Sequence, residues 1–347
     1  MKPRLLLPAA CILLLGACAP ALQEVKEAKE AKEVKEVKEV REVKKEVKEM
    51  TRVSEDFVVV LAREGDTAET LAARYLKGAD RAWMITDFRD GAAIKPGDVV
   101  VIPLRLRRLG GIEADGYQVV PILTYHDIET VSKGRFAITS ELFEQQLRYM
   151  KENGYTAITL AELDRFLRYE QPMPRKAVVI TIDDGYKSAK NIVVPLLKKY
   201  GFPATFFIYT DFIGGGRNAL TWDEVRELKA QGFEVQAHSK THNNLAVSPP
   251  NESPADRAAR LEGEIVSTKQ LMEKRLGGEV RYFAYPYGGF DPEVVAKVKA
   301  AGYQIGFGAK KGSNPFFIDR YRLKRYSVFM EKDLTRFVQM LETFEKE

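Results

Sequence analysis

The amino-acid sequence predicts an α/β fold in which parallel strands alternate with helices, preceded by a smaller unit. Two observations lead to this prediction. From residue 117 to the C-terminus, short apolar runs typical of buried strands alternate with amphipathic patterns of helical period. Histidines or paired aspartates follow several of these runs, which is where active sites gather in barrels of alternating strands and helices.

The first residues predict export. Lys2 and Arg4 precede an apolar stretch at residues 5–15, which is too short to span a bilayer but suits a signal peptide. Residues 15–18, Leu-Gly-Ala-Cys, resemble the bacterial lipobox, and an ordinary small-residue cleavage site is the alternative. The resemblance implies a lipoprotein signal peptide at residues 1–17 and lipid attachment at Cys18. We therefore expect an exported lipoprotein anchored in the membrane and facing the periplasm, at the outer membrane.

Cysteine content and charge limit the possible partners. The chain has two cysteines and a formal net charge of +5. Cys11 would leave with the signal peptide and Cys18 would carry lipid, so no thiol would remain for a disulfide or a metal. The slight and dispersed excess of basic residues argues against a nucleic-acid partner.

Residues 24–49 repeat a Lys-Glu-Val triplet in which acidic and basic residues balance. An apolar residue at every third position drifts around a helix, so no continuous stripe for a coiled coil forms. We interpret residues 18–51 as the lipidated cysteine and a charged helical spacer, whose repeat at residues 24–49 would be roughly 40 Å long if fully helical. A docking helix for another protein is the alternative.

Residues 55–104 are predicted to form a small domain with the order strand, two helices, strand. Residues 65–67 are Gly-Asp-Thr, residues 71–75 are Leu-Ala-Ala-Arg-Tyr, and residues 96–103 are Pro-Gly-Asp-Val-Val-Val-Ile-Pro. This pattern resembles a LysM domain, which implies binding to glycans that contain N-acetylglucosamine. A domain that only packs on its neighbour is the alternative. Residues 105–116, with three arginines and a Gly-Gly pair, are interpreted as a linker.

The remaining chain supplies the strands and helices of the main fold. Strands are predicted at residues 117–124, 177–182, 204–209, 233–237, 282–284 and 304–307. Helices are predicted at residues 140–153, 187–200, 221–231, 254–276, 292–301 and 332–344. Because strands and helices alternate, we expect a parallel sheet with the helices outside it.

Two pairs of polar residues predict a metal site. Asp183 and Asp184 end the apolar run at residues 177–182, and burying both carboxylates is costly unless a cation neutralises one of them. His238 and His242 follow the run at residues 233–237. Their spacing places both rings on one side of a helical turn or tight loop, where they can share a metal. For each pair alone, a turn at Asp-Asp-Gly and a structural histidine pair are the alternatives.

The stretch from Tyr117 to the C-terminus resembles a NodB-type polysaccharide deacetylase domain, carbohydrate esterase family four. Residues 181–185, Thr-Ile-Asp-Asp-Gly, resemble its first motif, residues 238–242 its second, and residues 285–288, Tyr-Pro-Tyr-Gly, part of its third. The resemblance implies that residues 117–347 form a distorted, incomplete (β/α) barrel, typically of seven strands. It also implies the site roles. These are Asp183 as catalytic base, Asp184, His238 and His242 as metal ligands, and the backbone N–H of Tyr287 as oxyanion donor.

The implied reaction is the hydrolysis of an N-acetyl group. A divalent cation held by two histidines and one carboxylate would lower the pKa of water and polarise the acetyl carbonyl. We expect zinc, although cobalt, nickel and iron accept the same ligands. Asp183 would take the proton from the water, and a histidine is the natural donor of the proton that the departing sugar nitrogen needs.

Two positions depart from the commonest pattern of that family. No histidine follows His242, whereas many members carry the proton donor near the C-terminus. His126, which follows Leu-Thr-Tyr, matches instead the N-terminal Tyr-His placement of circularly permuted members, among them biofilm poly-N-acetylglucosamine deacetylases. We assign His126 as the general acid, with a core histidine as the alternative. Ala284 stands where many relatives have an arginine that orients the catalytic aspartate, and the sequence assigns this role to neither Arg281 nor Arg325.

Together these features predict a metal-dependent N-deacetylase at the cell envelope. Its substrate would be an N-acetylated polysaccharide, either peptidoglycan or exported poly-N-acetylglucosamine. The alternative from another class is a catalytically inactive glycan-binding lipoprotein that tethers the envelope to the cell wall. The presence of Asp183 beside all three ligands argues against this alternative, because a scaffold has no need for paired buried carboxylates.

Overall fold

The computed structural model describes residues 56–89, 91–104, 109–113, 115–131, 137–329 and 333–346. The chain divides between Arg105 and Leu106 into two compact units. The predicted signal peptide at residues 1–17, the lipid-attachment residue Cys18 and the spacer up to residue 51 lie outside the described residues. Within the described ranges, no helix combines the length and the apolar character that crossing a bilayer requires.

The first unit packs helices on a two-stranded sheet. Its elements are β1 (Phe57–Leu61), α2 (Ala68–Tyr75), the 3-10 helix η1 (Ala79–Arg81), α3 (Ala82–Phe88) and β2 (Val99–Pro103). The two strands are antiparallel, and their alternate residues are buried against the helices. A capping box between Thr67 and Thr70 starts α2. The predicted order of strand, two helices and strand is confirmed, while the LysM character of this unit stays a prediction.

Eight parallel strands form the central sheet of the second unit. The strand order is β13-β12-β11-β10-β9-β5-β14, and β8 pairs with the first two residues of β9. The strands are β5 (Ile122–Tyr125), β8 (Thr156–Ala157), β9 (Ala177–Asp184), β10 (Thr205–Ile208), β11 (Glu234–Ala237), β12 (Tyr282–Ala284), β13 (Ile305–Phe307) and β14 (Tyr326–Ser327). This parallel sheet agrees with the predicted (β/α) barrel fold.

The residues of β9 alternate between two cores. Val178, Ile180 and Ile182 belong to a core that includes residues of the surrounding helices. Ala177 and Val179 belong to a second core with inward residues of the neighbouring strands. Because side chains alternate along a strand, Thr181 and Asp183 follow Val179 on the inner face. The inner face is therefore apolar along most of β9 and polar at its carboxyl end.

One segment of chain bridges the two edges of the sheet. The N–H of Gly308, just after β13, donates to the carbonyl of Leu323 at 2.8 Å, and the N–H of Leu323 donates to Gly306 at 3.0 Å. Shortly afterwards, β14 pairs with β5 at the other edge. The sheet is thereby curled into an irregular barrel, and the bridging segment carries Arg325 between the two edges.

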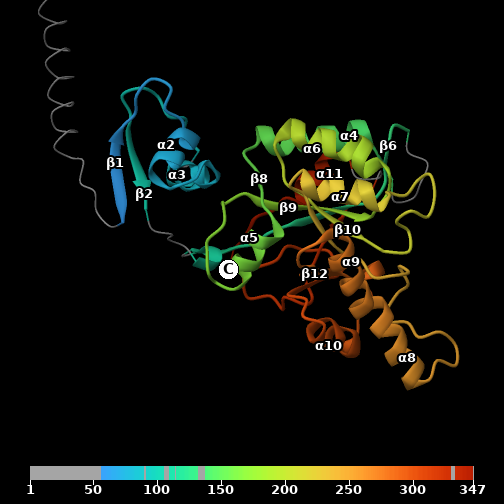
Figure 1. Ribbon diagram of the computed structural model, residues 1–347. Helices are drawn as coiled ribbons and strands as arrows, with labels where there is room; N and C mark the ends of the chain where they lie inside the picture. Colours follow the sequence, from blue (N-terminus) through green and yellow to red (C-terminus); the bar gives the residue numbers. More distant parts are fainter. Residues whose placement is uncertain are drawn as a thin grey trace, which may run out of the picture. The chain divides into compact units, whose positions relative to one another are not determined.

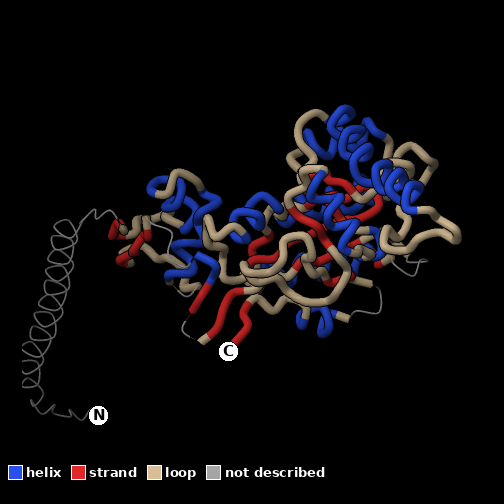
Figure 2. Tube along the Cα trace, turned by 90° about the horizontal axis from the view of Figure 1, so that it is seen from below, coloured by secondary structure: helices blue, strands red, loops and turns tan. Residues whose placement is uncertain are grey.

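Helices surround this sheet (Figures 1 and 2). They are α4 (Ser140–Glu152), α5 (Leu160–Leu167), α6 (Val194–Tyr200), α7 (Trp222–Ala230), α8 (Pro254–Leu261), α9 (Thr268–Leu276), α10 (Pro292–Ala300) and α11 (Leu334–Gln339), with the π-helical segments η3 (Ala189–Val193) and η4 (Glu262–Ser267) and the 3-10 helices η2 (Leu109–Gly111) and η5 (Pro286–Gly288). Short strands complete the unit: β3 (Ile112–Glu113), β4 (Gly116–Gln118) and β15 (Phe344–Lys346) form an antiparallel sheet, and β6 (Ile128–Glu129) pairs with β7 (Ile138–Thr139). In Figure 1, α4, α6 and α7 cover one side of β9 and β10.

Several elements differ from the sequence prediction. The single strand expected at residues 117–124 is two strands, β4 and β5, because the chain changes sheets around Pro121, which has no N–H to donate. The helix expected at residues 332–344 ends at Gln339, and the chain returns as β15, whose partner β4 lies more than two hundred residues earlier. In the predicted linker at residues 105–116, η2 and β3 already belong to the second unit. The sequence prediction did not include α5 and β8.

Candidate metal centre and active site

The predicted site residues lie at one edge of the sheet. Asp183 and Asp184 end β9, His126 follows β5, His238 follows β11, and Tyr287 follows β12. The pairing of these parallel strands is in register, with Tyr125 beside Ile182 and Ile208 beside both Asp184 and Ala237. Carboxyl ends of adjacent parallel strands meet at the same edge, so residues far apart in the sequence converge there.

A turn at Asp184 brings the two carboxylates to the same side. In a regular strand, the side chains of Asp183 and Asp184 would point to opposite faces of the sheet. Asp184 instead adopts a positive φ of 77°, and Gly185 follows with a φ of 101°. His238 Nε2 consequently lies 3.6 Å from Asp183 Oδ2 and 3.7 Å from Asp184 Oδ1.

The two histidines are held by a tight loop at residues 238–242, which we call the histidine loop. Ser239 and His242 have φ values of 69° and 61°, so the loop is not a turn of helix. Its ends are tied together, because the N–H of His242 donates to Ser239 Oγ at 3.1 Å. Positive φ is uncommon outside glycine and concentrates at functional sites. Four of the seven such residues in the described ranges are Asp184, Ser239, His242 and Tyr287.

Asp184, His238 and His242 form a cluster that fits a metal ion. Their ligand atoms all lie within 4.8 Å of one another, with His242 Nε2 3.2 Å from Asp184 Oδ1. Tetrahedral zinc with bonds of 2.0–2.1 Å requires ligand separations of about 3.3 Å. In the described part of the chain, the buried Asp184 Oδ1 accepts no hydrogen bond, which is costly for a carboxylate without a cation.

The protonation of the cluster also suits a metal. Burial lowers the pKa of His238 to about 4, although Asp183 and Asp184 oppose the shift. The ring is therefore neutral near pH 7. His238 Nδ1 lies 2.8 Å from the carbonyl of Ala284, to which it can only donate, so Nε2 presents its lone pair to the cluster. For Asp184, burial favours a higher pKa, but the imidazole of His242 and the charges of His238 and His126 outweigh it and lower the pKa.

Asp183 is held by Arg325. The arginine donates from Nη1 to Asp183 Oδ1 at 2.9 Å, and its Nη2 lies 2.9 Å from Oδ2. Its Nε donates to the carbonyl of Gly308, also at 2.9 Å. Both side chains are buried, so this bidentate pair is shielded from solvent and fixes the orientation of the carboxylate. The other candidate, Arg281, pairs with Glu279 instead.

His126 and Tyr287 lie at the same edge of the sheet as the cluster. His126 directly follows β5, which pairs with β9, the strand that carries the two aspartates. Its ring stacks at 6.3 Å on Phe329, which follows β14. Tyr287 is 66% exposed, and its ring centroid lies 4.8 Å from that of His242. The structure thus brings every predicted site residue of the second unit to the carboxyl edge of the sheet, while their individual roles remain predictions.

Sequence reasoning did not find two of the supporting residues. Arg325 was one of two candidates, and no sequence motif distinguished it from Arg281. Glu264 was not singled out, yet its buried carboxylate accepts hydrogen bonds from the histidine loop. It lies in a π-helical segment, which an apolar periodicity of 3.6 residues does not reveal.

The fold and the site define a class of protein, a parallel α/β barrel with an Asp-His-His cluster beside a second buried carboxylate. The family model described as polysaccharide deacetylase matches residues 170–306, a range that contains both aspartates and both histidines of the site. Residues 170–306 of the second unit therefore match the polysaccharide deacetylase family.

Relatives and a solved structure agree with this assignment. The chain is 28% identical over 209 residues to YxkH of Bacillus subtilis, a protein named for the polysaccharide deacetylases, covering 60% of this chain and 71% of that protein. It is 26% identical over 221 residues to a poly-beta-1,6-N-acetyl-D-glucosamine N-deacetylase of Staphylococcus aureus, covering 58% and 75%. The Streptococcus pyogenes deacetylase PplD, solved in complex with acetate, is similar with a TM-score of 0.58 and 26% identity, covering 65% of this chain and 98% of that one.

Proposed function

We propose that the protein is a metal-dependent N-deacetylase that removes acetyl groups from an N-acetylglucosamine polymer. The observation that supports this most strongly is the side-by-side arrangement of two aspartates with different partners. Asp184 Oδ1 accepts no hydrogen bond within the described residues and faces two imidazoles, whereas Asp183 is held by Arg325 at both oxygens. This arrangement provides one carboxylate for a cation and another for proton transfer.

Asp184, His238 and His242 would hold the cation. When bound, a divalent metal lowers the pKa of water and polarises the acetyl carbonyl. Asp183 would accept the proton of the attacking water. Each carboxylate oxygen has two lone pairs, so Asp183 retains acceptor capacity while Arg325 fixes its plane. Pre-organisation of the base by a buried arginine removes the need to reorient it during the reaction.

The remaining steps fall to His126 and Tyr287. The departing sugar nitrogen must gain a proton, and we assign its donation to His126, the one of the three histidines that is outside the metal cluster. The backbone N–H of Tyr287 would donate to the oxyanion of the tetrahedral intermediate. Tyr287 lies in the bend after β12, and its ring centroid is 4.8 Å from that of His242, which supports this role.

Poly-N-acetylglucosamine is the substrate that we favour. The S. aureus relative is a deacetylase of this polymer, and the placement of His126 before the two aspartates supports the same subgroup. Peptidoglycan is the second candidate, because the signal sequence predicts an envelope location and the first unit has the element order of a LysM-like domain. We also propose lipid anchoring at Cys18, which rests on the lipobox-like sequence alone.

The experiment that tests this proposal is acetate release by the purified full-length protein supplied with zinc or cobalt. Poly-N-acetylglucosamine, peptidoglycan and chitooligosaccharides are offered in parallel. We expect release from at least one polymer, with the highest kcat/KM for poly-N-acetylglucosamine. The Asp184→Ala variant serves as the control that lacks one proposed ligand.

Failure to release acetate from all three polymers would contradict the enzyme assignment. Retention of the wild-type protein on the same glycans would then favour the inactive glycan-binding protein. A preference for peptidoglycan would retain the mechanism and change the substrate.

A further inference from the structure

We propose that Glu264 is a positioning residue of the metal centre, which holds the histidine loop in the conformation that aligns His238 and His242. This inference rests on the proposed metal site and adds a residue to it from a different part of the chain. Glu264 lies in η4, the π-helical segment between α8 and α9, and it is only 5% exposed.

The side chain of Glu264 forms three hydrogen bonds with the middle of the histidine loop. Its Oε2 accepts hydrogen bonds from the backbone N–H groups of Lys240 and Thr241, at 2.9 and 3.0 Å. Its Oε1 accepts a hydrogen bond from the hydroxyl of Thr241 at 2.6 Å. One buried carboxylate therefore binds the two residues that stand between Ser239 and His242.

The opposite side of the loop is tied to the segment after β10. The carbonyls of Ser239 and Lys240 accept hydrogen bonds from the N–H groups of Thr210 and Asp211, at 3.2 and 3.0 Å. Hydrogen bonds therefore hold the histidine loop from two directions, from the residues that follow β10 and from Glu264. Because Ser239 and His242 both have positive φ, this conformation is intrinsically unfavourable and needs such support from outside the loop.

The π-helical segment that carries Glu264 is fixed to a neighbouring part of the chain. The carbonyl of Ile265 accepts a hydrogen bond from the N–H of Thr268 and a second one from the Tyr303 hydroxyl, at 3.0 Å. Two residues away from Glu264 in the same segment, Glu262 points to Lys297 instead, at 2.5 Å.

Glu262 therefore provides a matched control. Glu264→Ala and Glu264→Gln are compared with Glu262→Ala in the full-length protein. Zinc affinity is measured by competition with a chromophoric chelator, and the absorption spectrum of the cobalt-loaded protein reports the geometry of the ligands. Neither measurement depends on catalytic activity.

We expect Glu264→Ala to weaken zinc binding about 10- to 100-fold, as is typical when a residue that supports metal ligands is removed, and to alter the cobalt spectrum. Glu264→Gln retains one acceptor oxygen for the two N–H groups, so its affinity should fall between those of wild type and Glu264→Ala. Glu262→Ala should match wild type.

Zinc affinity and a cobalt spectrum equal to wild type in Glu264→Ala would overturn the inference and leave the metal site intact. If Glu264→Ala does not fold, Glu264→Gln decides, because unchanged zinc affinity in that variant would overturn the inference equally. A wild-type protein that binds no zinc would instead overturn the metal centre itself, and this inference with it.

Discussion

The carboxyl and amino ends of the central sheet both contain buried polar side chains, but their bonding differs. Gln236 lies in β11 and contacts the amino end of β12, whereas His238 directly follows β11 and contacts the carboxyl end of β12. Gln236 Oε1 accepts hydrogen bonds from the N–H groups of Arg281 and Tyr282, at 2.9 and 3.0 Å. His238 bonds to Ala284 through Nδ1 only, and its Nε2 faces the two aspartates.

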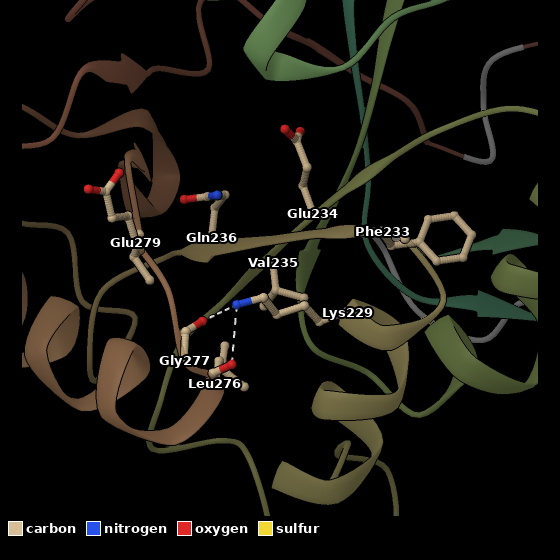
Figure 3. A pocket seen from close by; sticks show the side chains of 10 residues that line it. Lys229, Phe233, Glu234, Val235, Gln236, Leu276, Gly277 and Glu279 are labelled. Atoms are coloured by element: carbon tan, nitrogen blue, oxygen red, sulfur yellow. Dashed lines mark hydrogen bonds between the residues drawn. The ribbon is translucent and has the colours of Figure 1, made fainter.

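The amino end also has an open cavity of about 270 Å³, shown in Figure 3. Its polar side chains are already paired. Lys229 donates to the carbonyls of Leu276 and Gly277, and Glu234 accepts from Leu160 and from the hydroxyl of Thr205. The comparison teaches that the bonding of the polar groups distinguishes a reactive site from a structural one better than the presence of a cleft does.

The largest difference is expected between an isosteric change at the carboxyl end of the sheet and a similar change at the amino end, which serves as its control. Asp183→Asn removes the proposed base, so acetate release should fall by about 10²- to 10⁴-fold while zinc affinity stays near wild type. Glu234→Gln retains an acceptor for its two partners and should leave acetate release within about twofold. Initial rates and zinc competition measure both. Substantial activity in Asp183→Asn would mean that another group takes the proton.

A smaller effect is expected from changing the arginine that holds the base. Arg325→Lys keeps the positive charge but loses the bidentate contact with Asp183, so kcat should fall about 10- to 100-fold with little change in KM. Arg320→Lys is the control, because Arg320 precedes Arg325 in the same bridging segment and contacts Asp164 at 3.3 Å. Equal kcat values for Arg325→Lys and Arg320→Lys would show that Arg325 stabilises the fold but does not orient the catalytic base.

The smallest effect concerns the stability of the metal-free protein. Because burial lowers the pKa of His238 to about 4, the unfolded chain binds a proton near pH 6.5 that the folded chain binds only near pH 4. The contribution to the free energy of unfolding is therefore complete above pH 6.5 and is lost as the pH falls toward 4, by up to roughly 3 kcal/mol. Gln236 adds no such dependence, since its amide does not titrate in this range.

Urea denaturation with a chelator present, at several pH values between 4 and 7, measures this dependence. The His238→Asn variant cannot titrate and should show a shallower decrease in stability than wild type. If the free energy of unfolding decreased equally with pH in the two proteins, His238 would not be a buried neutral imidazole in the folded state.

The parts of this structure that could be predicted from sequence depend on local patterns. The Asp-Asp-Gly turn after an apolar run and the four-residue spacing of the histidines sufficed to predict that Asp183, Asp184, His238 and His242 lie together, because strand ends and metal-ligand spacing are visible locally. The strands β9 and β11 were found for the same reason.

The parts that were missed depend on contacts between distant segments. Arg325 lies in a strand-like stretch, but it reaches Asp183 across 142 residues of sequence, and no local pattern indicates that contact. The strand β15 exists because β4 pairs with it, which no pattern near residue 344 indicates. Glu264 resembles any other helical glutamate until its loop partners are known.

The most direct test of the metal-dependent site is to follow acetate release from poly-N-acetylglucosamine after chelation, while zinc is added back in measured equivalents. The account predicts no release by the metal-free protein and a rise that reaches its plateau at one zinc per chain. It also predicts no recovery for His238→Ala at that stoichiometry. Full release in the presence of chelator, or none at any zinc content with a polymer that the protein binds, would contradict it.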